Sequence, residues 1–291
     1  MIDDIELKEL YDRMHDCDIC PRNCRQDRYS ATDGICGMPV KLRIASYGPH
    51  YGEEPELVGY SASGTIFFSG CNLLCKFCQN YDISHFRQGT DVSEEELATI
   101  MLKLQSSGVE NINLVTPSHY APQIIKALFF AKEYGLKIPV VYNSSGYDKV
   151  EILKKMDGLI DIYMPDIKFV EKDKGRKMAA APTYFEYASK ALVEMHRQVG
   201  DLLIESGVAK KGLLVRHLVL PNDMSDTKKI IDFIADRIGT DTYLNLMDQY
   251  HPAHRACEIA GLDQSVSGDE FKEYVNYAKE KGFTRPDYLY G

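Results

Sequence analysis

The sequence predicts an α/β protein built around a parallel, partly closed (β/α)6 barrel of the TIM-like type. Apolar segments of strand length alternate with longer segments whose apolar residues recur every three or four positions. Because helices connect successive strands, the strands should run parallel with right-handed crossovers. A small cysteine-rich extension is expected over residues 1–60, followed by the barrel with its C-terminal helix over residues 61–291.

The composition limits the classes of function. With 43 acidic and 34 basic residues, the net charge of −9 argues against broad binding of nucleic acid. No apolar run is long enough to span a membrane, and the first residues are polar and acidic, unlike a signal peptide. We therefore expect a cytoplasmic protein with no membrane partner, for which nucleic acid is an unfavoured ligand.

The N-terminal extension begins with an amphipathic helix over residues 2–15. Four cysteines follow, namely Cys17, Cys20, Cys24 and Cys36. Such a set can bind structural zinc or an iron–sulfur cluster, and both alternatives stay open beside reduced cysteines without metal. Residues 41–47 and 57–60 flank a turn-rich stretch and predict an antiparallel hairpin that leads into the barrel.

The first barrel strand is expected over residues 65–68, ending at a Ser-Gly turn. Directly after it stand Cys71, Cys75 and Cys78, spaced C-x3-C-x2-C. Iron–sulfur clusters are held by cysteine thiolates, and three thiolates leave one iron of a four-iron cluster without a protein ligand. An open metal position is typical of a reactive site. The motif therefore predicts a catalytic [4Fe-4S] cluster rather than a zinc site or three unconnected thiols.

The remaining elements follow from the apolar periodicity. The helix over residues 91–107 should begin with a capping box formed by Ser93 and Glu96. Further strands are predicted over residues 111–116, 138–143, 159–163, 213–220 and 243–247. Further helices are predicted over residues 121–134, 149–156, 184–205, 227–238 and 269–281. Residues 169–183 are expected to form a long loop at the barrel mouth, either facing the substrate or solvated.

Polar residues gather at the carboxyl ends of these strands, where curled parallel sheets carry their chemistry. They include Thr116, Ser118, Asn143, Asp166, Lys168, Arg216 and His251. We expect these side chains to converge on the loop with the three cysteines.

The three-cysteine motif, with Phe77 just before its last cysteine, resembles the radical S-adenosylmethionine (SAM) superfamily. The resemblance implies that SAM chelates the open iron through its amino and carboxylate groups. It also implies that the reduced cluster cleaves SAM to methionine and a 5′-deoxyadenosyl radical, which abstracts hydrogen from a substrate. A flavodoxin or a ferredoxin-like protein is implied as electron donor. The sequence identifies neither the substrate nor the hydrogen atom.

Within that superfamily the chain resembles the glycyl-radical-enzyme activases, such as the pyruvate formate-lyase activating enzyme, and especially their PflX-type relatives. The matching segments are Gln79-Asn80, the D-x-K of Asp166 and Lys168, Tyr250-His251, and residues 113–120, 215–221 and 245–252. The resemblance implies an activase-like oxidoreductase, with a protein as one candidate substrate. The residues implied to bind SAM are Phe77, Thr116, Ser118, Asn143, Asp166, Lys168, Arg216 and His251.

One segment departs from the superfamily pattern. Where most members have a G-G-E-like segment that accepts hydrogen bonds from the SAM amino group, residues 116–119 read T-P-S-H. Oxygen atoms here can still accept such bonds, but the anionic partner is missing.

Two other functions stay open. One is a non-catalytic electron carrier with two iron–sulfur clusters, which would not bind SAM. The other is a radical SAM enzyme that modifies RNA and uses the N-terminal cysteines as a zinc module. The acidic charge balance weighs against the RNA enzyme.

Overall fold

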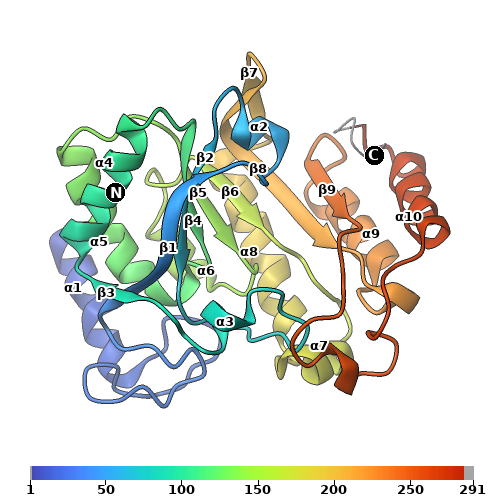
Figure 1. Cartoon of the computed structure of the whole chain (residues 1–291), viewed down its shortest axis with the longest axis horizontal. Helices are drawn as coiled ribbons and strands as arrows, with labels where there is room; N and C mark the ends of the chain where they lie inside the picture. Colours follow the sequence, from blue (N-terminus) through green and yellow to red (C-terminus); the bar gives the residue numbers. More distant parts are fainter. Residues whose placement is uncertain (1, 285–291) are drawn as a thin grey trace.

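In the computed structural model, which describes residues 2–284, one mixed sheet organises the molecule (Figure 1). Within these residues the sheet has nine strands in the order β3-β1-β2-β4-β5-β6-β8-β7, with β9 beside β8. The last part of the barrel domain predicted over residues 61–291, residues 285–291, lies outside the described residues.

Six strands of the described chain run parallel to one another, as the sequence predicts. They are β2 (Ser63–Phe68), β4 (Asn111–Val115), β5 (Val140–Ser144), β6 (Ile162–Pro165), β8 (Val208–Leu218) and β9 (Tyr243–Met247). Pairing is parallel from β2 through β4 and β5 to β6, then from β6 to β8 and from β8 to β9. Their carboxyl ends therefore meet at one rim of the sheet.

The connecting helices lie close to their predicted positions. They are α4 (Glu94–Ser106), α5 (Ala121–Glu133), α6 (Val150–Lys154), α8 (Tyr184–Val199), α9 (Thr227–Arg237) and the C-terminal α10 (Gly268–Glu280). The Glu96 N–H donates to the Ser93 hydroxyl, and the Ser93 N–H donates to the Glu96 carboxylate. The predicted capping box at the start of α4 is thereby confirmed.

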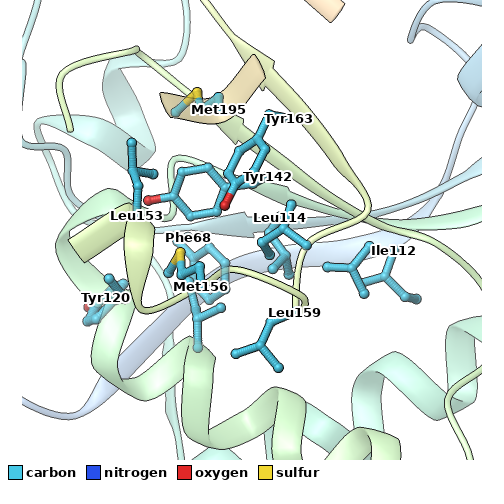
Figure 2. Close-up of a cluster of buried hydrophobic side chains, with 14 of the residues drawn as sticks. Phe68, Ile112, Leu114, Tyr120, Tyr142, Leu153, Met156, Leu159, Tyr163 and Met195 are labelled. Atoms are coloured by element: carbon cyan, nitrogen blue, oxygen red, sulfur yellow. The ribbon is translucent and has the colours of Figure 1, made fainter. Parts of the chain in front are cut away.

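A large apolar core lies between the sheet and its helices. Alternate strand residues point into it, among them Leu114 of β4, Tyr142 of β5 and Tyr163 of β6, and they meet helix side chains such as Met195 (Figure 2). All four side chains are fully buried, and burial of one such side chain contributes about 1.5–3 kcal/mol. Because side chains alternate along a strand, the intervening residues face the barrel interior.

The predicted hairpin is wrong in its second strand. Strand β1 (Leu42–His50) pairs antiparallel with β2, and β3 (Thr90–Val92) pairs antiparallel with β1. The stretch predicted as the partner of β1 holds the end of a short helix, α2 (Pro55–Val58), and the turn after it. Pro55 suits the first turn of a helix, where its missing N–H is not needed.

Helix α2 closes the amino-terminal end of the barrel. The Asn111 side chain donates to the Leu57 carbonyl at 2.7 Å, and the Tyr243 hydroxyl donates to Glu56 at 2.7 Å. Leu57 is itself fully buried in an apolar cluster with Ile162. The amino ends of the strands are thus covered.

Two further predictions need correction. Helix α8 ends at Val199 rather than at residue 205, because Gly200, with φ of 71°, terminates it; the chain then forms β7 (Leu203–Glu205), antiparallel to β8. The loop predicted over residues 169–183 contains helix α7 (Lys172–Ala179). The N–H of Lys76 in the cysteine loop donates to the Met178 carbonyl, so α7 lies against that loop.

The N-terminal region begins, as predicted, with helix α1 (Asp4–Asp12), which is followed by a 3₁₀ turn (Arg13–Asp16). Residues 17–41, all of them described, contain no regular helix or strand. The remaining short elements are α3 (Tyr81–Ser84) and 3₁₀ turns at Ser118–Tyr120, Pro221–Asp223 and Ala256–Glu258. Among residues 2–284, no helix has the length and apolar character needed to cross a membrane.

Candidate metal and cofactor site

The three-cysteine loop follows β2 at the carboxyl-terminal rim. Cys71, Cys75 and Cys78 line a cavity of about 260 Å³. The Leu73 N–H donates to the Cys71 sulfur at 3.3 Å, and the Cys78 sulfur lies 3.2 Å from the Ser84 hydroxyl oxygen. Hydrogen bonds to the sulfurs are one way in which proteins tune a bound iron–sulfur cluster.

Two of these thiols lie in a buried environment that disfavours charge. Burial raises the pKa of Cys71 and of Cys75, and the Lys168 ammonium opposes this rise at Cys75 without cancelling it. Burial thus disfavours the thiolate form of Cys71 and of Cys75 in the protein alone. Metal binding displaces the thiol protons and compensates the buried thiolate charge. The three side chains and the space beside them thus fit the predicted cluster.

The strand ends bring most of the predicted cofactor residues to the same cavity. Its lining includes Phe77, Thr116, Asn143, Asp166, Lys168 and Arg216. Phe77 comes from the cysteine loop, and the others come from the ends of β4, β5, β6 and β8. The convergence expected for these six residues is therefore present, while their binding of SAM stays a prediction.

A charge network crosses this cavity. Arg216 Nε donates to Asp166 Oδ1 at 2.9 Å, and Lys168 Nζ donates to Asp166 Oδ2 at 2.7 Å. Arg216 Nη2 also donates to Asn143 Oδ1 at 2.8 Å. Burial alone raises the pKa of the Asp166 carboxyl, but Arg216 and Lys168 outweigh burial and hold that pKa below its usual value. Two cations thus share the Asp166 carboxylate.

Two predicted residues lie elsewhere. Ser118 is buried behind the rim, where burial raises the pKa of Asp148 and a hydrogen bond from Ser118 opposes that rise. His251 is exposed, and its Nδ1 lies 3.1 Å from the Nε2 of Gln79, a residue that lines the cavity. Ser118 therefore does not line the cavity, and His251 lies at its edge.

Two acidic residues in the barrel interior escape prediction from the sequence. Glu53 lies 3.8 Å from Arg216 Nη1, and Glu54 accepts a hydrogen bond from Asn245 of β9 at 2.9 Å. Burial raises the pKa of Glu53, and the attraction of Arg216 only partly opposes this. Both residues belong to the turn-rich stretch assigned to the hairpin, whose pattern carries no signal for an interior position.

Thr116 has a strained backbone at the rim. Its φ of 62° lies in the left-handed region, which costs an L-residue roughly 1–2 kcal/mol and is rare for a β-branched side chain. The Thr116 N–H donates to the Asn143 carbonyl at 2.9 Å, which holds this conformation in place. Such strain concentrates at functional sites.

The four N-terminal cysteines surround a second, enclosed chamber. Its lining includes Cys17, Cys20, Cys24, Cys36, Arg28 and His119. Burial raises the pKa of Cys20 and of Cys36, and the Ile35 N–H donates to the Cys24 sulfur at 3.4 Å. Within residues 2–284, no three or more Cys, His, Asp or Glu side chains close on a point as the ligands of a single ion do. The four thiols thus share one chamber, in an environment like that of the three-cysteine loop.

Comparison with known proteins identifies the family of the barrel. A family model described as the radical SAM superfamily matches residues 65–234, more than half of the chain. Two uncharacterized proteins of Methanocaldococcus jannaschii are similar along most of their length. MJ0674 is 29% identical over 95% of this chain and 78% of its own, and MJ0808 is 23% identical over 86% and 76%.

One solved structure shows a similar fold. Methylornithine synthase (PylB) matches with a TM-score of 0.50 and 14% identity, over 97% of this chain and 71% of its own. HydG, described as a maturase of the [FeFe]-hydrogenase, matches with a TM-score of 0.47 and 17% identity over 72% of this chain. The match spans less than half, 47%, of the HydG chain.

Proposed function

This chain belongs to the radical SAM superfamily, and from that premise we propose that it cleaves SAM reductively and abstracts a hydrogen atom from a second substrate. Membership of the superfamily supports a [4Fe-4S] cluster and SAM as its cofactors. The observation that carries the proposal is the shared cavity of Cys71, Cys75 and Cys78 with the charge network around Asp166.

The chain's own residues have separate tasks in this proposal. Cys71, Cys75 and Cys78 hold the cluster, which supplies the electron that cleaves SAM when it is bound. The cationic side chains of Lys168 and Arg216 attract the SAM carboxylate to the rim, and the cavity walls limit access of water to the reacting groups.

The amino group of SAM needs acceptors, and the rim offers few charged ones. Ser118 does not line the cavity, so the T-P-S-H segment contributes Thr116 there. We assign the oxygen atoms of Thr116 as acceptors for the amino group, assisted by the carboxylate of Asp166. Phe77 and the edge residue His251 are assigned to the rest of the cofactor.

The second substrate is assigned by resemblance. Gln79-Asn80, the D-x-K of Asp166 and Lys168, and Tyr250-His251 favour an activase-like reaction, in which hydrogen is abstracted from a partner protein. Helix α7 supports this assignment, because it lies against the cysteine loop next to the cavity. A flavodoxin or ferredoxin-like protein in the cytoplasm is the proposed electron donor.

A second metal centre is part of the proposal. Cys17, Cys20, Cys24 and Cys36 line one chamber and can supply the four thiolates of a complete cubane. Zinc sites more often pair two C-x2-C knuckles, and this segment contains one, so we favour a second [4Fe-4S] cluster over zinc. Anaerobic metal analysis should find about eight iron atoms per chain for two cubanes, but about four with one zinc for the alternative.

The decisive test is SAM cleavage by the reconstituted protein. Reduced with dithionite under anaerobic conditions, it should convert SAM to 5′-deoxyadenosine. Single changes Cys71→Ala, Cys75→Ala or Cys78→Ala should abolish this product, because each removes a ligand of the cluster. Cys257→Ala is the matched control, since Cys257 is exposed and lines neither cavity. Cleavage that survives any of the first three changes would overturn the proposal.

A further inference from the structure

The barrel interior contains polar side chains to which the proposed binding of SAM gives no role. Thr65 of β2 and Asn113 of β4 are partners in the parallel pairing of these two strands, so their side chains lie side by side. Leu114, the next residue of β4, points into the apolar core (Figure 2), so Asn113 and Thr65 face the barrel interior instead. Neither side chain lines the cavity beside the three cysteines.

These two side chains are fully buried and have unused hydrogen-bonding atoms. Both residues are 0% exposed, and no described group forms a hydrogen bond with Thr65 Oγ1 or Asn113 Oδ1. A buried polar atom without a partner is costly, so its presence calls for an explanation such as a bound ligand. There is room for one: Gly48 of β1 pairs with Thr65, and a Cβ placed on Gly48 would meet nothing within 4 Å apart from its chain neighbours.

Two carboxylates complete this group of side chains. Glu54 accepts a hydrogen bond from Asn245 through Oε1, whereas its buried Oε2 has no partner among the described residues. The side chain of Glu53 is 8% exposed, and its Oε1 lies 3.2 Å from His50 Nδ1. Burial raises the pKa of Glu53, and a hydrogen bond from the Asn113 amide opposes this rise, so the two side chains face each other. Glu54 is also the N-cap residue of α2, but its side chain does not cap that helix.

The charges around Arg216 are unequal. Its Nε donates to Asp166, while its Nη1 lies 3.8 Å from Glu53. The carboxylates of Asp166, Glu54 and Glu53 all act on this guanidinium, and Lys168 is paired with Asp166. When these five groups are ionised, carboxylates outnumber cations, and the excess lies on the Glu53 side of Arg216.

We propose that the interior cluster, formed by Glu53, Glu54, Asn113 and Thr65, binds a cationic N–H group of the second substrate, either a primary ammonium or a guanidinium. This assignment rests on the proposed function, which requires a second substrate beside SAM. A cationic N–H group brings positive charge to the carboxylates and donors to the unused oxygen atoms. An anionic group would be repelled by the carboxylates, and an apolar group would leave the oxygen atoms unpaired.

Arg216 links the interior cluster to the cofactor site. Its guanidinium lines the cavity beside the three cysteines and also approaches Glu53, so the two sites adjoin. The cationic group thus anchors the substrate in the interior, and the remainder of the substrate extends towards the rim, where hydrogen is abstracted. A free amine and a basic side chain of a partner protein share this chemistry.

Calorimetric titration of the reconstituted, SAM-loaded protein tests the assignment without reduction of the cluster. The probes are n-butylamine, which is cationic at neutral pH, and its anionic and neutral counterparts butyrate and n-butanol. Butylamine should bind at least about tenfold more tightly than either counterpart. A short peptide, acetyl-Gly-Lys-Gly-amide, is titrated beside its acetyl-lysine version. Binding of butylamine alone supports a free amine as substrate, whereas binding of the lysine peptide supports a side chain of a partner protein.

Two variants locate the binding site. Glu53→Gln removes one charge with little change of shape, so it should weaken butylamine binding at least about tenfold and change SAM affinity far less. Thr65→Val covers the case in which Glu53→Gln does not fold. It replaces a hydroxyl that has no partner, so the melting temperature should not fall, while butylamine binding should weaken about fivefold. Glu186→Gln, an exposed carboxylate on α8, is the matched control and should change neither affinity.

Three results would overturn the assignment. They are equal binding of the three butyl compounds, wild-type butylamine affinity in either variant, and a loss of SAM affinity in Glu53→Gln as large as the loss for butylamine. The last result would mean that Glu53 serves the sulfonium of SAM. Failure of the wild type to cleave SAM with dithionite is a separate outcome, which would overturn the proposed function itself.

Discussion

At the scale of single residues, Asp166 is the centre of the cavity's charge balance. Its carboxylate joins Arg216 and Lys168, and the side chains of all three are less than one-fifth exposed. Asp166→Asn would leave Lys168 without its anion and Arg216 with the more distant Glu53 as its remaining ion-pair partner. Because breaking a buried pair from one side is costly, we expect a loss of about 2–4 kcal/mol in the free energy of unfolding.

The same change should weaken SAM binding by roughly tenfold, equivalent to about 1.4 kcal/mol, while the iron content of the loop cluster is retained. Equilibrium dialysis and metal analysis would measure the two effects. Lys190→Ala is the matched control, because its ion pair with Glu186 is exposed and should contribute less than about 0.5 kcal/mol. Wild-type SAM affinity in Asp166→Asn would show that the carboxylate is structural alone.

His217 should make stability depend on pH. Burial lowers its pKa to about 4, and the ring is held by the Ile167 carbonyl at Nδ1 and the Thr227 hydroxyl at Nε2. An unfolded histidine takes up a proton near pH 6.5, but the folded one resists until about pH 4. The unfolded state thus binds more protons in this window, and stability falls as the pH falls.

His217 alone should lower the free energy of unfolding by about 3 kcal/mol between pH 6.5 and pH 4. The free energy of unfolding of the metal-free protein can be measured with denaturant at several pH values. Between pH 6.5 and pH 4 it should fall by about this amount less in His217→Gln than in the wild type. Equal slopes for the two proteins would contradict the assignment of this pH dependence to His217.

At the scale of elements, the capping box at the start of α4 should make a measurable contribution to the stability of the protein. Ser93 and Glu96 satisfy each other's backbone N–H groups, so Ser93→Ala should lower the free energy of unfolding by about 1 kcal/mol. Thr99→Ala, on the exposed side of the same helix, serves as control and should change stability by less than about 0.5 kcal/mol. Thermal or urea unfolding measures both, and equal effects would argue against the cap.

The elements also show what the sequence can and cannot predict. The capping box and the six parallel strands follow from local chemistry and periodicity, and they are confirmed. Helix α7 is missed because its residues are mostly polar, so burial against the cysteine loop replaces an apolar stripe. Helix α8 is overextended because its apolar repeat continues past Gly200, where a φ of 71° ends the helix.

The candidate site also contains some residues that the sequence predicts and others that it does not. Cys71, Cys75 and Cys78 are recognisable because their ligand spacing is local. The interior position of Glu53 depends on α2 folding beneath the barrel, and the four carbonyls around Arg22 come from two distant segments. No pattern near these residues in the sequence encodes such long-range contacts.

At the scale of the whole molecule, we expect the N-terminal segment over residues 17–41 to depend on the metal proposed for its four cysteines. It contains no regular helix or strand and is joined to the barrel by the hydrogen bonds of Arg22 and Arg28 and by the buried side chains of Ile19 and Met38. Binding energy of a structural metal acts as folding energy. Removal of the metals should therefore unfold this segment before the sheet.

Hydrogen exchange can test this order. In the metal-free protein, amides of residues 17–41 should lose protection, whereas those of β4, β5 and β6 should keep most of theirs because their core is apolar. Reconstituted protein is the reference. Uniform loss of protection over both regions would mean that the molecule unfolds as one unit.

Helix α2 has a consequence for the order of events in turnover. Since it lies against the amino ends of β4 and β9, we expect both reactants to enter and leave at the opposite rim. The reactant that lies nearer the floor then has to enter first and depart last. We therefore expect compulsory-order steady-state kinetics, in which the reactant bound near the rim blocks release of the reactant bound deeper in the barrel.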